Sequence, residues 1–115
     1  MRRVLFALLL VALPAATRAA TDVPTEADRL LWCGGAFYWL AADAADAGND
    51  AESDDYQKWS DQLLDRAATL LAAAGLDAEA TDDLIETYTS RALEELASPT
   101  APYDVTATCP ALVTP

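Results

Sequence analysis

Histidine is absent from the 115-residue chain, and lysine occurs once, at Lys58. Histidine is the commonest general base in enzymes and the commonest ligand of transition metals, so its absence removes both roles together. The serines lie in no nucleophile-elbow pattern, and the two cysteines leave no free thiol once they are paired with each other. We therefore expect no hydrolytic triad, no zinc catalysis and, more generally, no enzyme.

Basic residues are also scarce, since seven lysines and arginines stand against nineteen aspartates and glutamates. The formal net charge of the chain is −12. Nucleic acids and anionic membrane surfaces are recognised through basic patches. We therefore expect neither of them to be a partner of this chain.

Carboxylates are the catalytic groups that remain, and two pairs of them stand at four-residue spacing. Asp82 with Glu86, and Asp61 with Asp65, would each share one helix face. Two acids alone can serve glycoside hydrolysis, so a carboxylate-only enzyme is a remote alternative. The simpler interpretation is that acids near a helix start favour its dipole and that the others cover an exposed face.

The acidic stretch around Gly48 invites comparison with a calcium-binding loop, because hard cations prefer clustered oxygen ligands. When Gly48 is placed at the required glycine, Asp43 fits the first ligand position. Ala45 and Ala47 then occupy the third and fifth positions, where ligands are needed. We therefore expect no metal and no other cofactor.

The N-terminus has the pattern of a secretory signal peptide. Two arginines after Met1 precede an apolar run over 4–13, and small residues follow it. The run falls short of the roughly 20 apolar residues that a membrane-spanning helix needs. We predict cleavage near Ala19, so that 1–19 is removed and 20–115 is a single mature domain in the periplasm or outside the cell.

The mature domain would be more acidic than its precursor. The predicted signal peptide holds three of the seven basic residues and none of the acidic ones. Four basic residues then stand against nineteen acidic ones, which is a formal net charge of −15.

Cys33 and Cys109 are the two cysteines, and in an exported chain they most simply form a disulfide. A metal-binding or reactive thiol pair would need closer spacing or histidine partners, which the sequence lacks. The bridge would close a loop of about 76 residues, for which the chain-entropy estimate of stabilisation is about 4.5 kcal/mol.

Apolar residues recur at steps of three and four along three segments, which predicts amphipathic helices over about 25–47, 53–74 and 78–97. The residues suited to cap the three helix starts are Thr25, Ser53 and Asp77. Prolines in the segment 98–115 disfavour another long helix, so we expect an extended strap there. The predicted fold class is all-α: a small three-helix bundle with an extended C-terminal strap tied to the first helix by the disulfide.

The first half of the first helix is apolar on every side. Trp32 and Trp39 lie opposite its regular apolar stripe, with Gly34 and Gly35 between them. Such a helix is either buried all round or offers one face to a partner. Glycine costs roughly 1 kcal/mol relative to alanine inside a helix, so the pair indicates that another backbone passes close or that the helix bends. The two tryptophans are therefore candidate partner-binding residues, unless the strap or another helix covers them.

These features favour a small exported protein that acts by protein–protein contact as an adaptor, modulator or inhibitor. Its partner would be another envelope protein, or a second copy that docks through the first helix. The alternative is an acid- or stress-responsive periplasmic holding chaperone. The expected layout resembles that of the small acid-activated periplasmic chaperones, which are also helical with a single disulfide. Because histidine is absent, any such switching would come from carboxylates, which lose their charge at about pH 3 to 5.

Overall fold

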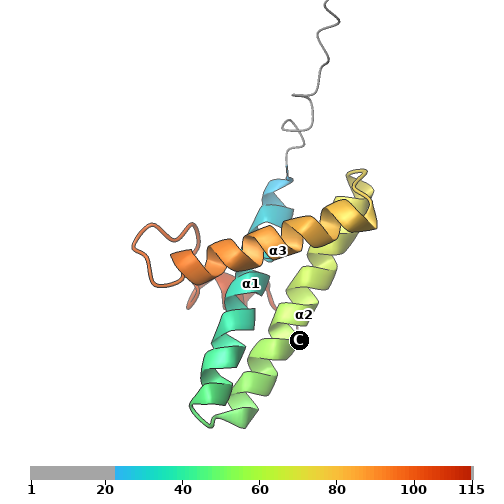
Figure 1. Cartoon of the computed structure of the whole chain (residues 1–115). Coiled ribbons are helices and arrows are strands. Elements are labelled where there is room, and N and C mark those ends of the chain that lie inside the picture. The colour runs from blue at the N-terminus through green and yellow to red at the C-terminus, as the bar shows by residue number, and fades with distance from the viewer. Residues whose placement is uncertain (1–22, 115) are drawn as a thin grey trace, which may run out of the picture.

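The computed structural model describes residues 23–114, which form four helices (Figure 1). Their bounds are α1 Thr25–Asp46, α2 Asp50–Ala73, α3 Ala78–Glu95 and α4 Thr108–Leu112. The predicted signal peptide over 1–19 and its cleavage site lie outside the described residues. In the described part of the chain, no helix is long and apolar enough to cross a membrane.

α1 and α2 form an antiparallel hairpin around the short connection 47–49 (Figure 1). The two helices approach closely at Gly34, where an added Cβ would lie 2.7 Å from Cδ2 of Leu64. The Ser60 hydroxyl, which is buried, donates a 2.8 Å hydrogen bond to the Gly34 carbonyl. The absence of a side chain at this position therefore lets α2 lie against the backbone of α1.

α3 crosses α1 at Gly35 (Figure 1). A Cβ at Gly35 would lie 2.9 Å from the Cα of Thr89, which is closer than real Cβ atoms come. One turn further along α1, Trp39 donates its indole hydrogen to the Thr89 carbonyl at 2.7 Å. The glycine pair predicted either a closely passing backbone or a bend in the helix. The closely passing backbone is confirmed at Gly35. This contact sets the position of α3 along α1.

The C-terminal strap, residues 98–114 of the structure, follows α3 and is tied to α1. The predicted Cys33–Cys109 disulfide is confirmed, with the two Cα atoms 5.3 Å apart. The strap is not extended throughout, because 108–112 form the short helix α4 around Cys109. Pro110 does not prevent this helix, since amide hydrogens in a first helical turn have no partner within the helix.

Two of the predicted capping residues, Thr25 and Ser53, need correction. α2 begins at Asp50, three residues before the predicted start, and the Ser53 hydroxyl donates 2.8 Å to the Ala41 carbonyl of α1 instead of capping α2. Thr25 is the first residue of α1 and makes no capping bond. The prediction for α3 is confirmed, because the Asp77 carboxylate accepts a hydrogen bond from the Ala80 amide.

The all-round apolar character of α1 has a simple explanation in the fold. Residues 30–37 are buried without interruption, because α2, α3 and the strap each cover a different side of the helix. Burial of this kind gives α1 no solvent-facing side over two turns. α1 is therefore the central helix of the three-helix bundle.

Candidate functional site

The face of α1 that α3 crosses continues beyond α3 without a covering helix. Tyr38, Ala42 and Ala45 follow Gly35 by three, seven and ten residues, so helical periodicity places all of them on that face. α3 covers this face around Gly35 and leaves the lower half of the α1–α2 hairpin bare (Figure 1). The uncovered half is the candidate functional site.

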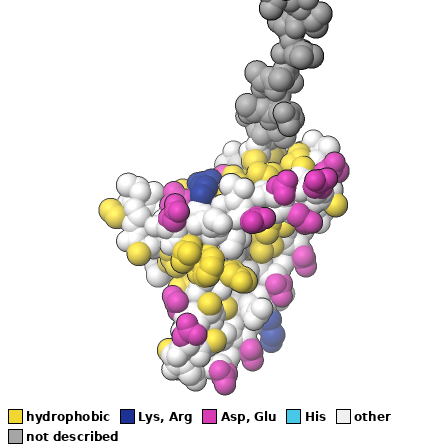
Figure 2. All heavy atoms as spheres, in the orientation of Figure 1, with side chains coloured by type: hydrophobic (Ala, Val, Ile, Leu, Met, Phe, Trp, Pro, Cys, Tyr) yellow, Lys and Arg dark blue, Asp and Glu magenta, His cyan; other side chains and the backbone are white. Residues whose placement is uncertain are grey.

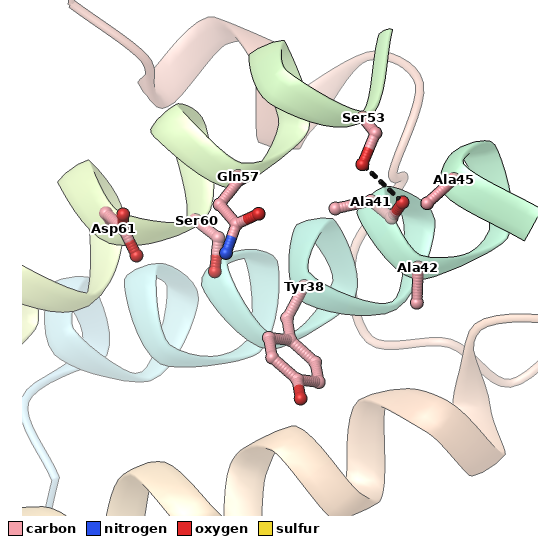
Figure 3. Close-up of a pocket in the computed structure, with 8 residues that line it drawn as sticks. All are labelled: Tyr38, Ala41, Ala42, Ala45, Ser53, Gln57, Ser60 and Asp61. Carbon is pink, nitrogen blue, oxygen red and sulfur yellow. Dashed lines mark hydrogen bonds between the residues drawn. The ribbon is translucent and has the colours of Figure 1, made fainter. Parts of the chain in front are cut away.

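A groove of about 230 Å³ lies there between α1 and α2 (Figure 3). We call it the hairpin groove, and its lining residues are Tyr38, Ala41, Ala42, Ala45, Ser53, Gln57, Ser60 and Asp61. The hydroxyls of Ser53 and Ser60 are already bonded to carbonyls of α1. In Figure 3 no hydrogen bond joins Gln57 or Asp61 to another lining residue, so their polar groups can face a ligand in the groove.

The described chain has two exposed large hydrophobic residues, and one of them lies in the groove. Tyr38 lines the groove and is 49% exposed, and Leu93 of α3 is 51% exposed. Leu93 follows Thr89 by one turn, and Thr89 is the residue whose carbonyl binds Trp39 at the start of the uncovered half. Figure 2 shows hydrophobic side chains gathered just below α3, where α1 passes beneath it.

Acidic side chains surround the same region. Asp82, Glu86 and Leu93 share one flank of α3, because they are spaced by four and seven residues. The opposite flank bears Tyr88, whose hydroxyl bonds to Asp28 near the start of α1, so the acidic flank faces the groove. Figure 2 shows acidic side chains along α3 and α2 beside the hydrophobic patch. The groove is therefore a partly apolar surface surrounded by negatively charged side chains.

The two carboxylate pairs considered from the sequence lie at the surface, and one of the four residues, Asp61, lines the hairpin groove. Asp82 and Glu86 are both exposed on α3, and Asp61 and Asp65 are both exposed on α2. In the part of the chain that the structure describes, no group of three or more acidic or cysteine side chains is placed to hold a metal ion.

Trp32, one of the two candidate partner-binding residues, is buried, and its side chain has no exposed area. Tyr103 of the strap packs against it with ring centroids 6.0 Å apart, and its indole donates a 3.2 Å hydrogen bond to Glu95 of α3. Trp39 is half-buried and bonded to α3. Strap and α3 together therefore cover the tryptophans.

Asp28 joins three parts of the fold. Its two carboxylate oxygens accept hydrogen bonds from the hydroxyls of Tyr88 on α3 and Tyr103 on the strap, the second at 2.5 Å. Burial, followed by the bond to Asp28, raises the pKa of Tyr88 to about 12, and the same two causes raise the pKa of Tyr103. Both tyrosines therefore remain donors well above neutral pH, which keeps this junction intact.

Side chains of α2 hold the end of the strap. Arg66 donates a 2.5 Å hydrogen bond to the Leu112 carbonyl, and the amide of Gln62 both donates to and accepts from the backbone of Thr114, at 3.0 and 2.7 Å. With the disulfide and Tyr103, the strap is fixed at four places. The strap is therefore a structural element of the bundle.

Comparison with family models, with curated proteins and with solved structures found no match to this chain. The fold itself defines the class, a small all-α bundle of three long helices closed by one disulfide. Its function therefore has to be argued from its own surface.

Sequence reasoning missed the hairpin groove, although a signal for it was present. The large apolar residues stop after Leu40, while alanines continue to the end of α1 at Asp46, within the predicted helix over 25–47. These small residues and the neighbouring α2 together leave a hollow.

Proposed function

We propose that the protein is exported and acts by protein–protein contact, as an adaptor, modulator or inhibitor, through the hairpin groove. The observation that carries this proposal is the groove itself, which is lined by Tyr38, one of the two large hydrophobic side chains that are exposed in the described chain. Exposed aromatic side chains are enriched where proteins contact one another. Export is supported by the signal-like sequence over 1–19 and by the disulfide, which persists in oxidising compartments.

The test of contact is photo-crosslinking in the native cell. A photoreactive residue replaces Ala42 in the groove, and in a matched strain it replaces Ala72, an exposed alanine near the other end of α2. We expect one discrete adduct from position 42 and none from position 72. The trapped protein, once purified, should bind this chain, and Ala42→Arg should abolish that binding while Ala72→Arg does not.

Export is tested separately by mass spectrometry of the protein from the envelope fraction. An N-terminus at or near Ala20 supports removal of the signal peptide. Recovery of the uncleaved chain from the cytoplasm would contradict the export part of the proposal. The proposed contact through the groove would not be affected.

A second candidate function is an acid-responsive holding chaperone. The observation that favours it is the Asp28 junction, where one carboxylate accepts bonds from both α3 and the strap above the buried Trp32. The many carboxylates of the chain lose their charge in acid, and release of α3 and the strap would then expose the tryptophan. Protection of a client protein from aggregation at about pH 3 but not at neutral pH supports this function, and equal behaviour at both pH values rules it out.

A further inference from the structure

The position of α3 shows how a helix fits against this face of α1. At Gly35 the backbones of the two helices touch, with the Thr89 Cα 2.9 Å from the Cβ position of the glycine. The hairpin groove begins three residues further along α1, at Tyr38. A second helix laid beside α3 would therefore enter the groove and lie over Ala42 and Ala45, whose short side chains permit close approach.

The walls of the groove suit the apolar side of such a helix. Tyr38, whose side chain is 49% exposed, lines the groove together with three alanines of α1. A helix seats in a groove of this kind through side chains spaced by three and four residues. Gln57 offers the amide that can bond to a polar group at the edge of that helix.

The negative charge around the groove favours a helix with basic residues on both sides of its apolar stripe. Asp82 and Glu86 lie on the groove-facing flank of α3, and Asp61 lines the opposite wall on α2. Lysine or arginine on both sides of the apolar stripe would meet these carboxylates, whereas acidic flanks would be repelled.

The same charge disfavours a second copy as the occupant. Residues 23–114 hold four basic residues against eighteen acidic ones, which is the nineteen of the whole chain less Asp22. Two copies joined through this face would bring like charges together. A basic partner is therefore the better match for the groove.

We infer that the hairpin groove binds an amphipathic helix of a partner protein, with a small or aliphatic stripe flanked by lysine or arginine. This inference rests on the proposed contact function and adds the chemistry of the partner. The helix lies beside α3, its stripe on Ala42 and Ala45 and its cations toward Asp61 and Glu86.

The inference is tested with three synthetic helical peptides of about 18 residues, or about five turns. The first carries an alanine–leucine stripe flanked by lysines, the second has the same stripe flanked by glutamates, and the third has the lysines of the first in a scrambled order without a stripe. Binding to the full-length mature protein is measured by fluorescence anisotropy and by calorimetry. We expect one molecule of the first peptide to bind, and the other two to bind at least about tenfold more weakly.

Variants locate the peptide on the protein. Ala42→Arg should weaken binding of the first peptide by about tenfold or more, and Ala72→Arg should leave it unchanged. The double change Asp82→Asn/Glu86→Gln should weaken it by roughly threefold, while Asp83→Asn/Glu94→Gln, which removes two charges from the outer face of α3, should have a smaller effect. Circular dichroism checks that every variant keeps its helices.

Three results would overturn the inference. Equal binding of the scrambled lysine peptide would reduce the interaction to nonspecific charge attraction. Equal binding of the glutamate-flanked peptide would remove the argument from charge. Self-association that Ala42→Arg abolishes would identify a second copy as the occupant.

The peptide experiment and the crosslinking experiment separate the two proposals. If no peptide binds but a photoreactive residue at position 42 still traps one envelope protein, the helix inference is wrong and the contact function stands. If neither result is obtained, both proposals are wrong.

Discussion

Tyr103 of the strap donates a hydrogen bond to the carboxylate of Asp28 on α1, across 75 residues of sequence. The other oxygen of the same carboxylate accepts from Tyr88 on α3. A single side chain of the central helix therefore fixes the two segments that cover Trp32. The stability of both covers should depend on this junction.

Removal of either phenol hydroxyl at the junction should destabilise the fold. Tyr103→Phe and Tyr88→Phe each delete one donor to a charged acceptor, and each should lower the free energy of unfolding by about 1–3 kcal/mol. The double variant should depart from the sum of the single variants, because both hydroxyls share Asp28. Urea unfolding of the four proteins in a double-mutant cycle measures this coupling. Strict additivity would show that the two bonds act independently.

Stability should decline in strong alkali because of the same tyrosines. The pKa of Tyr88 is raised from 10.0 to about 12 in the folded protein, and that of Tyr103 is also raised. The folded state therefore holds its protons longer than the unfolded state, so this contribution is complete below about pH 10 and is lost as the pH rises toward 12. Urea midpoints across this window should fall, and Tyr88→Phe should flatten the fall. A wild-type midpoint that is constant over this window contradicts the assignment.

Loss of the disulfide should release the strap more than the bundle. The bond spans 76 residues, for which the chain-entropy estimate of stabilisation is about 4.5 kcal/mol. Cys33→Ala/Cys109→Ala should lower unfolding stability by up to this amount and increase apolar-dye binding as Trp32 becomes exposed, while α1 to α3 keep their circular dichroism. A variant with unchanged stability and dye binding would show that the bonds from Tyr103, Arg66 and Gln62 hold the strap by themselves.

Alanine should be tolerated differently at the two neighbouring glycines of α1. At Gly35 the added methyl would meet backbone atoms of α3, with the Thr89 Cα at 2.9 Å, and the backbone cannot rotate away. At Gly34 it would meet the end of the Leu64 side chain at 2.7 Å, which can move. We expect Gly35→Ala to cost about 1–3 kcal/mol. Gly34→Ala should be close to neutral, since helix propensity contributes about 1 kcal/mol in its favour.

Thermal or urea unfolding of the two single variants decides this comparison, with each variant serving as the other's control. Equal destabilisation at the two positions would mean that α3 can shift along α1. The close contact at Gly35 would then not fix the crossing.

The helices and the disulfide were predictable from sequence because each depends on local or unique information. Apolar residues that recur at steps of three and four indicate a helix wherever one side of that helix faces solvent. The pairing of Cys33 with Cys109 had no competitor, since the chain has two cysteines. The cap at Asp77 follows from a side chain bonding three residues ahead.

The candidate site was not predictable in the same way. Trp32 and Trp39 were candidates because an all-round apolar helix gives no sign of which side is covered. The structure buries Trp32 beneath the strap and α3, and it leaves Tyr38 and Leu93 at the surface instead. The distinction depends on where α3 crosses α1, which periodicity within a single helix does not specify.

By itself the sequence therefore determined three helices, one covalent tie, an acidic surface and the lack of histidine chemistry. Only the tertiary structure decided that Asp28 would join α3 to the strap, that Ser53 would bind Ala41 instead of capping α2, and that a groove would open below α3. These features arise between residues that are distant in sequence. At Gly34 and Gly35 the absence of a side chain permits the close approach of Leu64 and of the α3 backbone, but the sequence does not specify which neighbour approaches.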